Sequence, residues 1–513
     1  MPSFPPSIFE YITQEKSQYE TGKIKILDND EWNMASHIQN SLSFKRGKFI
    51  SASNELKNKP PFKNIVLPIL RVRYRAEDID VKDIVIYIEE PEKHHLSFLV
   101  KKYWEDVWTI ENDFDSFLDK AKEEKIDLGG CLVKKGVGSI PEVVPLQSIA
   151  FCDQTDLLGG PIGLKFNFSP GKLKVKAKQG WGNEANGADI TIDALIRLAT
   201  NQKDASGIDI GIANQITGKN IEVYVVRGTL PSAYLKKEGD IEKMVNQVQV
   251  VAFYRDEKNQ AQGVTLYKSE EKEEVYKTHS SEEIYNRALG LGGVEELFDS
   301  QVWTNSAEIK KNDMLKSASK VVLWTDDDAY ANRSKIKNME NLEITVVSKE
   351  SRGISQVPTG SPNIQLFTQS LQEWEIHARE LGGATDPLMG KQPPAGTPFR
   401  LQERVVFESK GLHEYRMGKF AKFVEEVMRD WIIPQIAREI TKGKKFLSNL
   451  TPDEMQMLAD KISTNRAAKA QIEDVLNGKI PENYDVLKQK FQQEFFAGGN
   501  NRFLEILQDE LKG

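Results

Sequence analysis

The amino-acid sequence predicts an α+β fold, and two observations support that prediction. Residues 126–268 contain short runs of β-branched residues separated by glycine-containing turns, as is typical of β-strands. From Ser281 onward, apolar residues recur three and four positions apart, which is the spacing of amphipathic helices. One interruption, at residues 318–362, divides this helical half of the chain.

Length and composition further narrow the range of folds and functions that the chain can have. The sequence has 513 residues, of which 39% are hydrophobic and 28% charged, and its formal net charge is −7. Single hydrophobic cores rarely grow beyond about 250–300 residues, so we expect several packed units. The acidic balance argues against tight nonspecific binding of DNA, which usually needs a basic excess. We see no signal peptide and no apolar stretch of the ~20 residues that a membrane helix needs, so we expect an intracellular chain.

The N-terminal half is predicted as follows. Residues 1–61 are polar and mixed, and Pro60-Pro61 closes them. Residues 62–87 are predicted as strands because they are rich in β-branched residues. Residues 94–125 carry one broad apolar stripe at helical spacing. We also predict a short helix at 190–199 and strands at 221–226 and 248–254.

In the C-terminal half, the best patterned helix covers residues 364–381. Its heptad-like apolar seam consists of Ile364, Phe367, Leu371, Trp374, Ala378 and Leu381. Gly382-Gly383 is expected to end this helix. Residues 384–396 hold three prolines and two glycines and cannot continue it. Thr397-Pro398 is expected to begin another helix, perturbed near Gly411 and ended by Pro434.

The remaining elements are shorter. The interruption contains two strand-like runs, at 321–324 and 342–347. Near the end of the chain, Thr451 and Glu454 stand in capping-box register, which predicts a helix start. Two short helices are predicted after it, at 464–477 and 482–497.

The sequence lacks the usual catalytic signatures. It contains no phosphate-binding loop, no GxSxG and no HExxH motif, so we expect no enzyme. Cys131 and Cys152 are most simply buried small residues, and the six histidines suggest no metal pair. No metal and no cofactor are therefore expected.

Two charged clusters allow alternatives. Asp326-Asp327-Asp328 is either a solvated loop tip, which we favour, or a carboxylate cluster for two-metal nuclease chemistry. The basic residues Arg333, Lys335 and Lys337 form either an ordinary surface patch or a contact for phosphate or a partner protein.

The order of the predicted elements resembles that of the portal proteins of tailed double-stranded DNA bacteriophages. Residues 284–298, with Gly290-Leu291-Gly292-Gly293, resemble the approach to the first stem helix of that family. Residues 383–396 are similar to its tunnel loop. Residues 393–401 and 62–70 are most like the portals of crAss-like phages.

The resemblance implies a portal fold with a β-rich wing, paired stem helices flanking a small α/β clip, a tunnel loop and helix, and a helical crown. The implied divisions are an N-terminal segment at 1–61, the wing at 62–283, the first stem helix at 284–317, the clip at 318–362, the second stem helix at 363–383, the tunnel loop at 384–396, the tunnel helix with its connection at 397–440 and the crown at 441–513.

The resemblance also implies a function. Portal proteins form a ring, usually of twelve subunits, at a unique capsid vertex, where DNA is packaged and ejected. The implied partners are further copies of the chain, the major capsid protein, the terminase and then the head–tail adaptor, internal or cargo virion proteins, and double-stranded DNA without sequence specificity. The location would be the virion, after assembly in the bacterial cytoplasm, with no membrane involved.

Candidate site residues follow from these implied roles. In the tunnel loop, the DNA-channel residues would be Met389, Lys391, Gln392, Pro393 and Pro394. The acidic channel wall would contain Glu373, Glu380 and Glu295 or Glu296, since carboxylates repel phosphates and let DNA slide. The clip contacts would be Arg333, Lys335 and Lys337. Phe367, Leu371 and Trp374 would pack between subunits, or alternatively inside the core of one subunit.

Two other functions remain open at this point. The runner-up is another head–tail connector or minor virion structural protein, which would share the composition and ring symmetry. A metal-dependent nuclease that uses Asp326-Asp327-Asp328 is the alternative from a different class.

Overall fold

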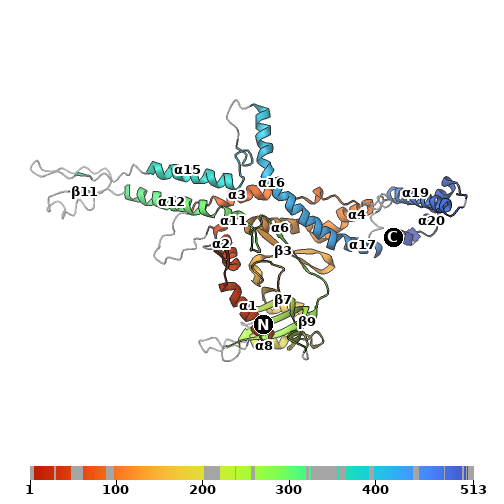
Figure 1. Cartoon of the computed structure of the whole chain (residues 1–513), viewed down its shortest axis with the longest axis horizontal. Coiled ribbons are helices and arrows are strands. Elements are labelled where there is room, and N and C mark those ends of the chain that lie inside the picture. The colour runs from red at the N-terminus through yellow and green to blue at the C-terminus, as the bar shows by residue number, and fades with distance from the viewer. Residues whose placement is uncertain are drawn as a thin grey trace, which may run out of the picture. The chain divides into compact units, whose positions relative to one another are not determined.

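The computed structural model describes residues 5–27, 30–47, 62–87, 97–200, 220–236, 239–255, 260–318, 323–324, 355–356, 364–391, 398–442, 450–478, 480–499, 502–503 and 505–506. Its helices and strands confirm a mixed α+β fold (Figure 1). The chain forms two compact units. The first unit contains residues 1–39, 74–292 and 411–513, and the second contains residues 40–73 and 293–410.

A five-stranded antiparallel sheet with the strand order β5-β6-β7-β8-β9 lies in the first unit. Its strands are β5 (Ile149–Phe151), β6 (Ile162–Phe168), β7 (Ile221–Pro231), β8 (Met244–Arg255) and β9 (Ala261–Glu270). In the register of the two central strands, Val223 lies opposite Ala252 and Val225 opposite Val250. The strands predicted at 221–226 and 248–254 are confirmed.

Different helices cover the two faces of this sheet. On one face, Val223 and Ala252 belong to a core with α7 (Pro170–Ala177) and α8 (Ile192–Thr200), which confirms the helix predicted at 190–199. On the other face lies α1 (Ile8–Thr21), whose Phe9 ring is 4.8 Å from the ring of Phe253. Successive side chains of a strand point to opposite faces, so neighbouring residues of β8 serve two different cores.

A second, three-stranded antiparallel sheet of the first unit has the order β10-β3-β4. It consists of β10 (Tyr276–Ser280), β3 (Gly130–Lys135) and β4 (Pro141–Val144). Gly129 joins α6 (Phe114–Leu128) to β3 with φ at +83°, and a Cβ there would lie 2.1 Å from the carbonyl oxygen of Gly290. Only glycine fits that close backbone approach. A hairpin of β1 (Ile24–Leu27) and β2 (Asp30–Trp32) completes the strands of this unit that the structure describes.

The largest hydrophobic core of the first unit is built by helices from distant parts of the sequence. They are α4 (Ser97–Tyr103), a π-helical turn (Trp104–Trp108), α6, the C-terminal part of α16 (Phe399–Val427), a second π-helical turn (Met428–Ile432), α17 (Ile433–Lys442), α19 (Pro452–Leu476) and α20 (Tyr484–Ala497). Short helix α5 (Thr109–Asn112) links the first π-helical turn to α6. The helix predicted at 94–125 is thus confirmed over its described part.

The cysteines behave largely as expected. Cys131 is buried in this core, and Cys152 is half-buried outside it. Burial raises the pKa of both thiols to about 12, so both are protonated at neutral pH and are poor nucleophiles.

The second unit contains the predicted long helices. Its described elements include α11 (Gly293–Glu296), α12 (Phe298–Ala318) and α15 (Ile364–Leu381), and the last of these confirms the prediction for residues 364–381. Strands β11 (Leu323–Trp324) and β12 (Ser355–Gln356) form an antiparallel ladder between α12 and α15 in the sequence. Helices α2 (Met34–Lys45), α3 (Val66–Ala76) and α16 each contain a boundary between the units.

The strands predicted over 62–87 are wrong. Residues 66–76 form α3, followed by a 3-10 turn at Val81–Asp83. The buried residues Val66, Ile69, Leu70 and Arg73 recur three and four apart, which is a helical spacing hidden by the β-branched composition. Pro68 is tolerated because it lies in the first turn, where its missing N–H has no helical partner.

The first stem helix predicted over 284–317 begins too early. Residues 281–292 form turns, and the long helix starts at Phe298. Just before these turns, β10 was not predicted at all, because its polar residues Lys277, Thr278 and His279 give no alternating pattern.

Three predictions near the C-terminus also differ from the structure. Pro434 does not end the helix, because the wider π-helical turn before it spares the clash that a proline ring makes within an α-helix. Gly411 lies inside continuous α16. The capping box of Thr451 and Glu454 is confirmed, but it opens one long helix, α19, that absorbs the short helix predicted at 464–477. The helix predicted at 482–497 is confirmed as α20.

Candidate functional site

The end of α15 and the turns after it form the candidate site in the second unit. A Cβ on Gly382 would lie 2.3 Å from Cγ2 of Ile69 in α3, so this position needs a glycine for close packing. Gly383 has φ at +66°, and the Ala384 N–H donates to the carbonyl of Arg379 at 2.9 Å. This arrangement caps the helix and confirms the predicted stop.

A chain of ion pairs runs from α15 into the following turns. Arg379 lies 3.9 Å from a carboxylate oxygen of Glu375 and 3.8 Å from one of Asp386. Lys391 Nζ lies 2.7 Å from Asp386 Oδ1, and this hydrogen bond lowers the pKa of Asp386. Exposed pairs of this kind contribute little to stability.

The other predicted channel residues are only partly described. Met389 is half-buried, and its N–H donates to the carbonyl of Thr385 at 3.0 Å. Gln392, Pro393 and Pro394 lie outside the described residues. So do the clip residues Arg333, Lys335 and Lys337 and the carboxylates Asp326-Asp327-Asp328. The roles assigned to all of these residues stay predictions.

Acidic side chains are exposed along α15. Glu373 and Glu380 are both exposed and lie seven residues apart, which places them on one side of the helix. The Gln369 side chain donates to Glu373 at 3.0 Å. The third candidate, Glu295, is half-buried in α11, whereas its neighbour Glu296 forms a 3.0 Å ion pair with Arg73. A row of exposed carboxylates is therefore present on α15 but does not extend to Glu296.

The heptad-like seam of α15 packs within the unit. Leu371 and Ala378 are buried, Phe367 is half-buried, and the indole of Trp374 stacks on that of Trp303 in α12 with ring centroids 6.2 Å apart. Leu371 therefore already has a partner surface inside its own chain. The exposed apolar side chains of this helix pair include Leu381 of the seam and, outside the seam, Val302, Trp303, Leu366 and Ile376.

A polar face of α12 holds the segment before α3. The side-chain oxygen of Gln301 accepts the N–H of Ile65 at 2.9 Å, and its amide donates to the carbonyl of Lys63 at 2.7 Å. Asn305, one turn further along, accepts the N–H of Lys63 at 3.3 Å. The spacing of Gln301 and Asn305 is visible in the sequence, but their partners, more than 200 residues away, are not.

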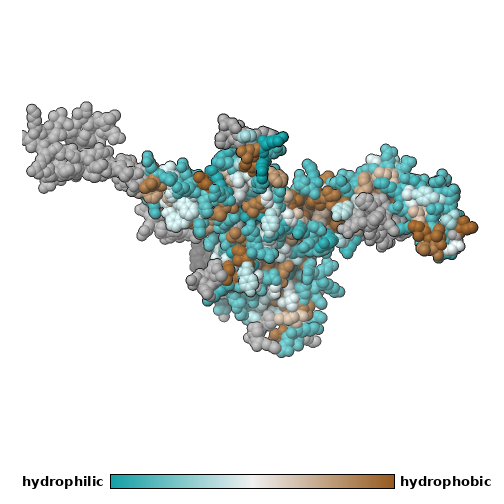
Figure 2. All heavy atoms as spheres, turned by 45° about the horizontal axis from the view of Figure 1, so that its top comes forward, coloured by the Kyte–Doolittle hydropathy of each residue, from teal (hydrophilic) through white to brown (hydrophobic). Residues whose placement is uncertain are grey.

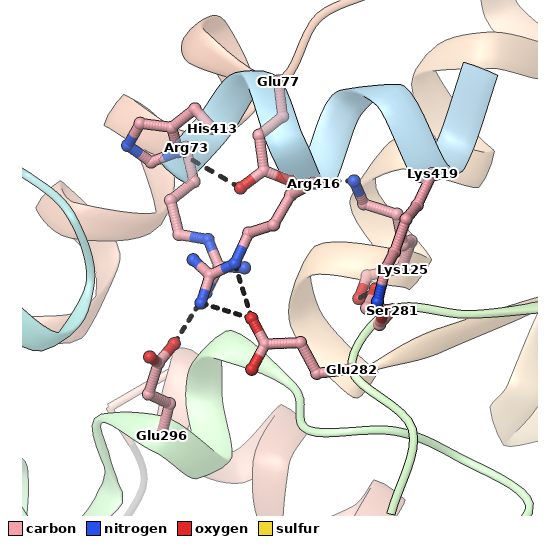
Figure 3. Close-up of polar contacts among 9 residues, drawn as sticks. All are labelled: Arg73, Glu77, Lys125, Ser281, Glu282, Glu296, His413, Arg416 and Lys419. Atoms are coloured by element: carbon pink, nitrogen blue, oxygen red, sulfur yellow. Dashed lines mark hydrogen bonds and ion pairs between the residues drawn. The ribbon is translucent and has the colours of Figure 1, made fainter. Parts of the chain in front are cut away.

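In the first unit, a buried charge cluster surrounds Glu77 (Figure 3). Its Oε2 lies 2.8 Å from Nζ of Lys125, and its Oε1 lies 3.3 Å from Nδ1 of His413. The Glu77 and Lys125 side chains are 0% and 1% exposed, so neither charge is solvated. Such a pair is stable only while both partners are present.

The same side of α16 also contacts Ser281 and Glu282, the two residues that follow β10. Arg416 contacts one carboxylate oxygen of Glu282 with two nitrogens (Figure 3): Nε donates to it at 2.8 Å, and Nη2 lies 2.7 Å from it. Lys419 donates to the carbonyl of Ser281 at 3.5 Å. The basic residues recur at intervals of three, which aligns them on one face of α16. This cluster was not predicted from the sequence, because charged residues at that spacing usually mark a solvated helix face.

His279 of β10 lies against the same helix. Its ring centroid is 5.5 Å from that of Phe420 and 5.4 Å from that of Phe423. Burial, assisted by the charges of Lys125 and Lys419, lowers the pKa of His279 to about 4. It is therefore neutral at physiological pH.

The parts of the chain that the structure describes contain no group of three or more His, Cys, Asp or Glu residues that could hold a metal ion. Within the same described ranges, no helix is long and apolar enough to cross a membrane.

Comparisons with known proteins give a likeness among solved structures alone. No family model matches the sequence, and no curated protein matches it. Among solved structures, the chain is similar to one described as "Virion of native gene transfer agent (GTA) particle". That alignment has a TM-score of 0.29 and 9% sequence identity, and it covers 86% of this chain and 94% of the other.

Proposed function

We propose that this chain is a portal protein, the ring-forming subunit through which a tailed phage packages and ejects its DNA. The observation that carries the proposal is the order of elements from α12 to α16. Helix α12 precedes a small antiparallel ladder, helix α15 follows it and ends at Gly382-Gly383, and the 29-residue helix α16 is the next helix in the sequence. This is the order of stem helix, clip, stem helix, tunnel loop and tunnel helix that the sequence resemblance implies.

Charge on α15 supports a passive conduit. Glu373 and Glu380 form an exposed acidic row, and a wall of carboxylates facing phosphates prevents DNA from sticking. In this proposal Lys391 is the basic exception, because its weak pair with Asp386 lets it exchange with passing phosphates. The energy for packaging would come from a separate terminase motor.

A closed ring needs a heterologous interface, in which two different surfaces of each subunit meet. The exposed apolar residues of the α12–α15 pair, above all Leu366 and Ile376, are suited to one side of it. The partners in this proposal are further copies of the chain, the capsid protein, the terminase, the head–tail adaptor and DNA.

Electron microscopy of the purified full chain tests the proposal. We expect rings with a central hole, because a heterologous interface whose rotation closes gives a ring, and the resemblance to portal proteins implies about twelve subunits. Leu366→Asp combined with Ile376→Asp should leave folded monomers, whereas the matched control Gln365→Asp with Gln372→Asp, at exposed polar positions of the same helix, should keep rings. A wild-type chain that stays monomeric at all concentrations would refute the ring, and rings without a central hole would favour another virion component.

A further inference from the structure

Four exposed apolar side chains gather at the end of α19 and in the turn after it. Ile472, Val475, Leu476 and Ile480 are 59%, 61%, 80% and 95% exposed. Figure 2 shows hydrophobic atoms at the end of the α19–α20 pair. Isolated exposed apolar residues are common, but a contiguous group at one tip usually marks an interaction site. We call these four residues the apolar tip.

The helix end presents the apolar tip in a fixed arrangement. Residues three and four apart lie on one side of a helix, so Ile472, Val475 and Leu476 share a face. The Asn477 N–H donates to the carbonyl of Glu473 at 2.9 Å, and Gly478, with φ at +71°, turns the chain. Because the helix remains regular up to this turn, a partner would meet a preformed surface.

The charge around the apolar tip is acidic. Residues 472–486 contain four acidic side chains, Glu473, Asp474, Glu482 and Asp485, and a single lysine. The last turn of α19 holds no basic residue. The carbonyl end of a helix is the negative pole of its dipole, so Glu473 and Asp474 stand where a carboxylate is least favourable. A cation of a bound partner would offset this unfavourable electrostatic interaction.

We propose that the apolar tip binds a basic amphipathic helix of another protein, with apolar residues on one face and lysines or arginines along its edges. The apolar face would cover Ile472, Leu476 and Ile480, and the basic edges would meet the carboxylates and the end of the helix dipole. A second copy of this chain is a poor occupant, because two acidic rims repel each other. An anionic membrane is a poor occupant for the same reason.

Two designed peptides test the proposal on the full chain. One is a fluorescent Leu/Lys helix with leucines on one face and lysines on its flanks, and the other is a matched Leu/Glu helix. We expect the Leu/Lys peptide to bind at least about tenfold more tightly, with an affinity that falls as salt rises. Leu476→Gln combined with Ile480→Gln should weaken its binding about tenfold or more. Glu473→Gln with Asp474→Asn should weaken binding and flatten the salt dependence.

A control variant separates the apolar tip from general stickiness. Val137, in the turn between β3 and β4 of the same unit, is 93% exposed but belongs to neither α19 nor the apolar tip, so Val137→Gln should leave binding unchanged. Equal binding of both peptides, or binding that ignores the tip variants, would overturn the proposal. Sedimentation that shows self-association through Leu476 would assign the surface to a second copy instead. Tip-dependent binding to phosphatidylcholine vesicles would assign it to lipid.

Discussion

His279 should make the first unit sensitive to acid. Burial lowers its pKa from the usual 6.5 of a histidine to about 4, so the unfolded chain takes up a proton more readily than the folded one. The stability that depends on neutral His279 is complete above pH 6.5 and falls as the pH drops toward 4. Below the folded-state pKa the loss stays constant, because both states are then protonated.

The size of the effect follows from the shift in pKa. A shift of one unit corresponds to about 1.4 kcal/mol, so the full loss is about 3 kcal/mol, and about 2 kcal/mol of it has occurred by about pH 5. The folded carboxylates with lowered pKa, such as Asp430 and Glu454, contribute in the same direction. The contribution of His279 must therefore be measured as a difference between variants.

Urea denaturation of the wild type and of His279→Leu, at about pH 7.5 and about pH 5, isolates this contribution. Leucine fits beside Phe420 and Phe423 and does not titrate, so the variant should lose about 2 kcal/mol less than the wild type over this range. Thr278→Val changes the neighbouring residue of β10 without removing a titrating group and should keep the wild-type loss. If His279→Leu lost as much stability on acidification as the wild type, His279 would not be buried and neutral as described.

Two further predictions concern packing. Lys125→Met should destabilise the chain by about 3–5 kcal/mol, because it leaves the buried carboxylate of Glu77 without its cation. The double variant Lys125→Met with Glu77→Gln should recover much of this stability. Chemical denaturation measures both variants, and a single variant as stable as the wild type would contradict the buried pair. Gly418→Ala should stabilise α16 by up to about 1 kcal/mol, since nothing lies within 4 Å of the added Cβ. Gly382→Ala should destabilise the chain by about 1–3 kcal/mol, because the added Cβ would contact Ile69. Equal melting temperatures for the two variants would disprove the close packing at Gly382.

Local signals in the sequence predicted the elements whose causes are local. Helix α15 was predicted to the residue, because its apolar spacing and its glycine stop lie within a few positions of each other. The capping box of Thr451 and Glu454 was confirmed for the same reason. Helix α3 was not predicted, because the prediction relied on the β-branched composition of this segment. The helical spacing of Val66, Ile69 and Leu70, which are buried on one face of α3, was the better signal.

The candidate site was predicted in part. The acidic row of Glu373 and Glu380 is exposed as expected, since exposure of a charged residue follows from its helix face. The pairing of Lys391 with Asp386 lies within five residues but was not predicted, because the turn between them sets the geometry.

The sequence by itself determined the α+β class, the place of α15 with its stop at Gly382-Gly383, and the exposed acidic row on that helix. These features depend on side chains within one or two turns of each other. Only the tertiary structure decided that Leu371 faces its own chain, that Gln301 holds a segment more than 200 residues away, and that Glu77, Lys125 and His413 form a buried cluster. Long-range partners leave no periodic mark in a sequence, because a buried charge or amide is tolerated only where the fold brings a partner to it, and that partner can lie anywhere along the chain.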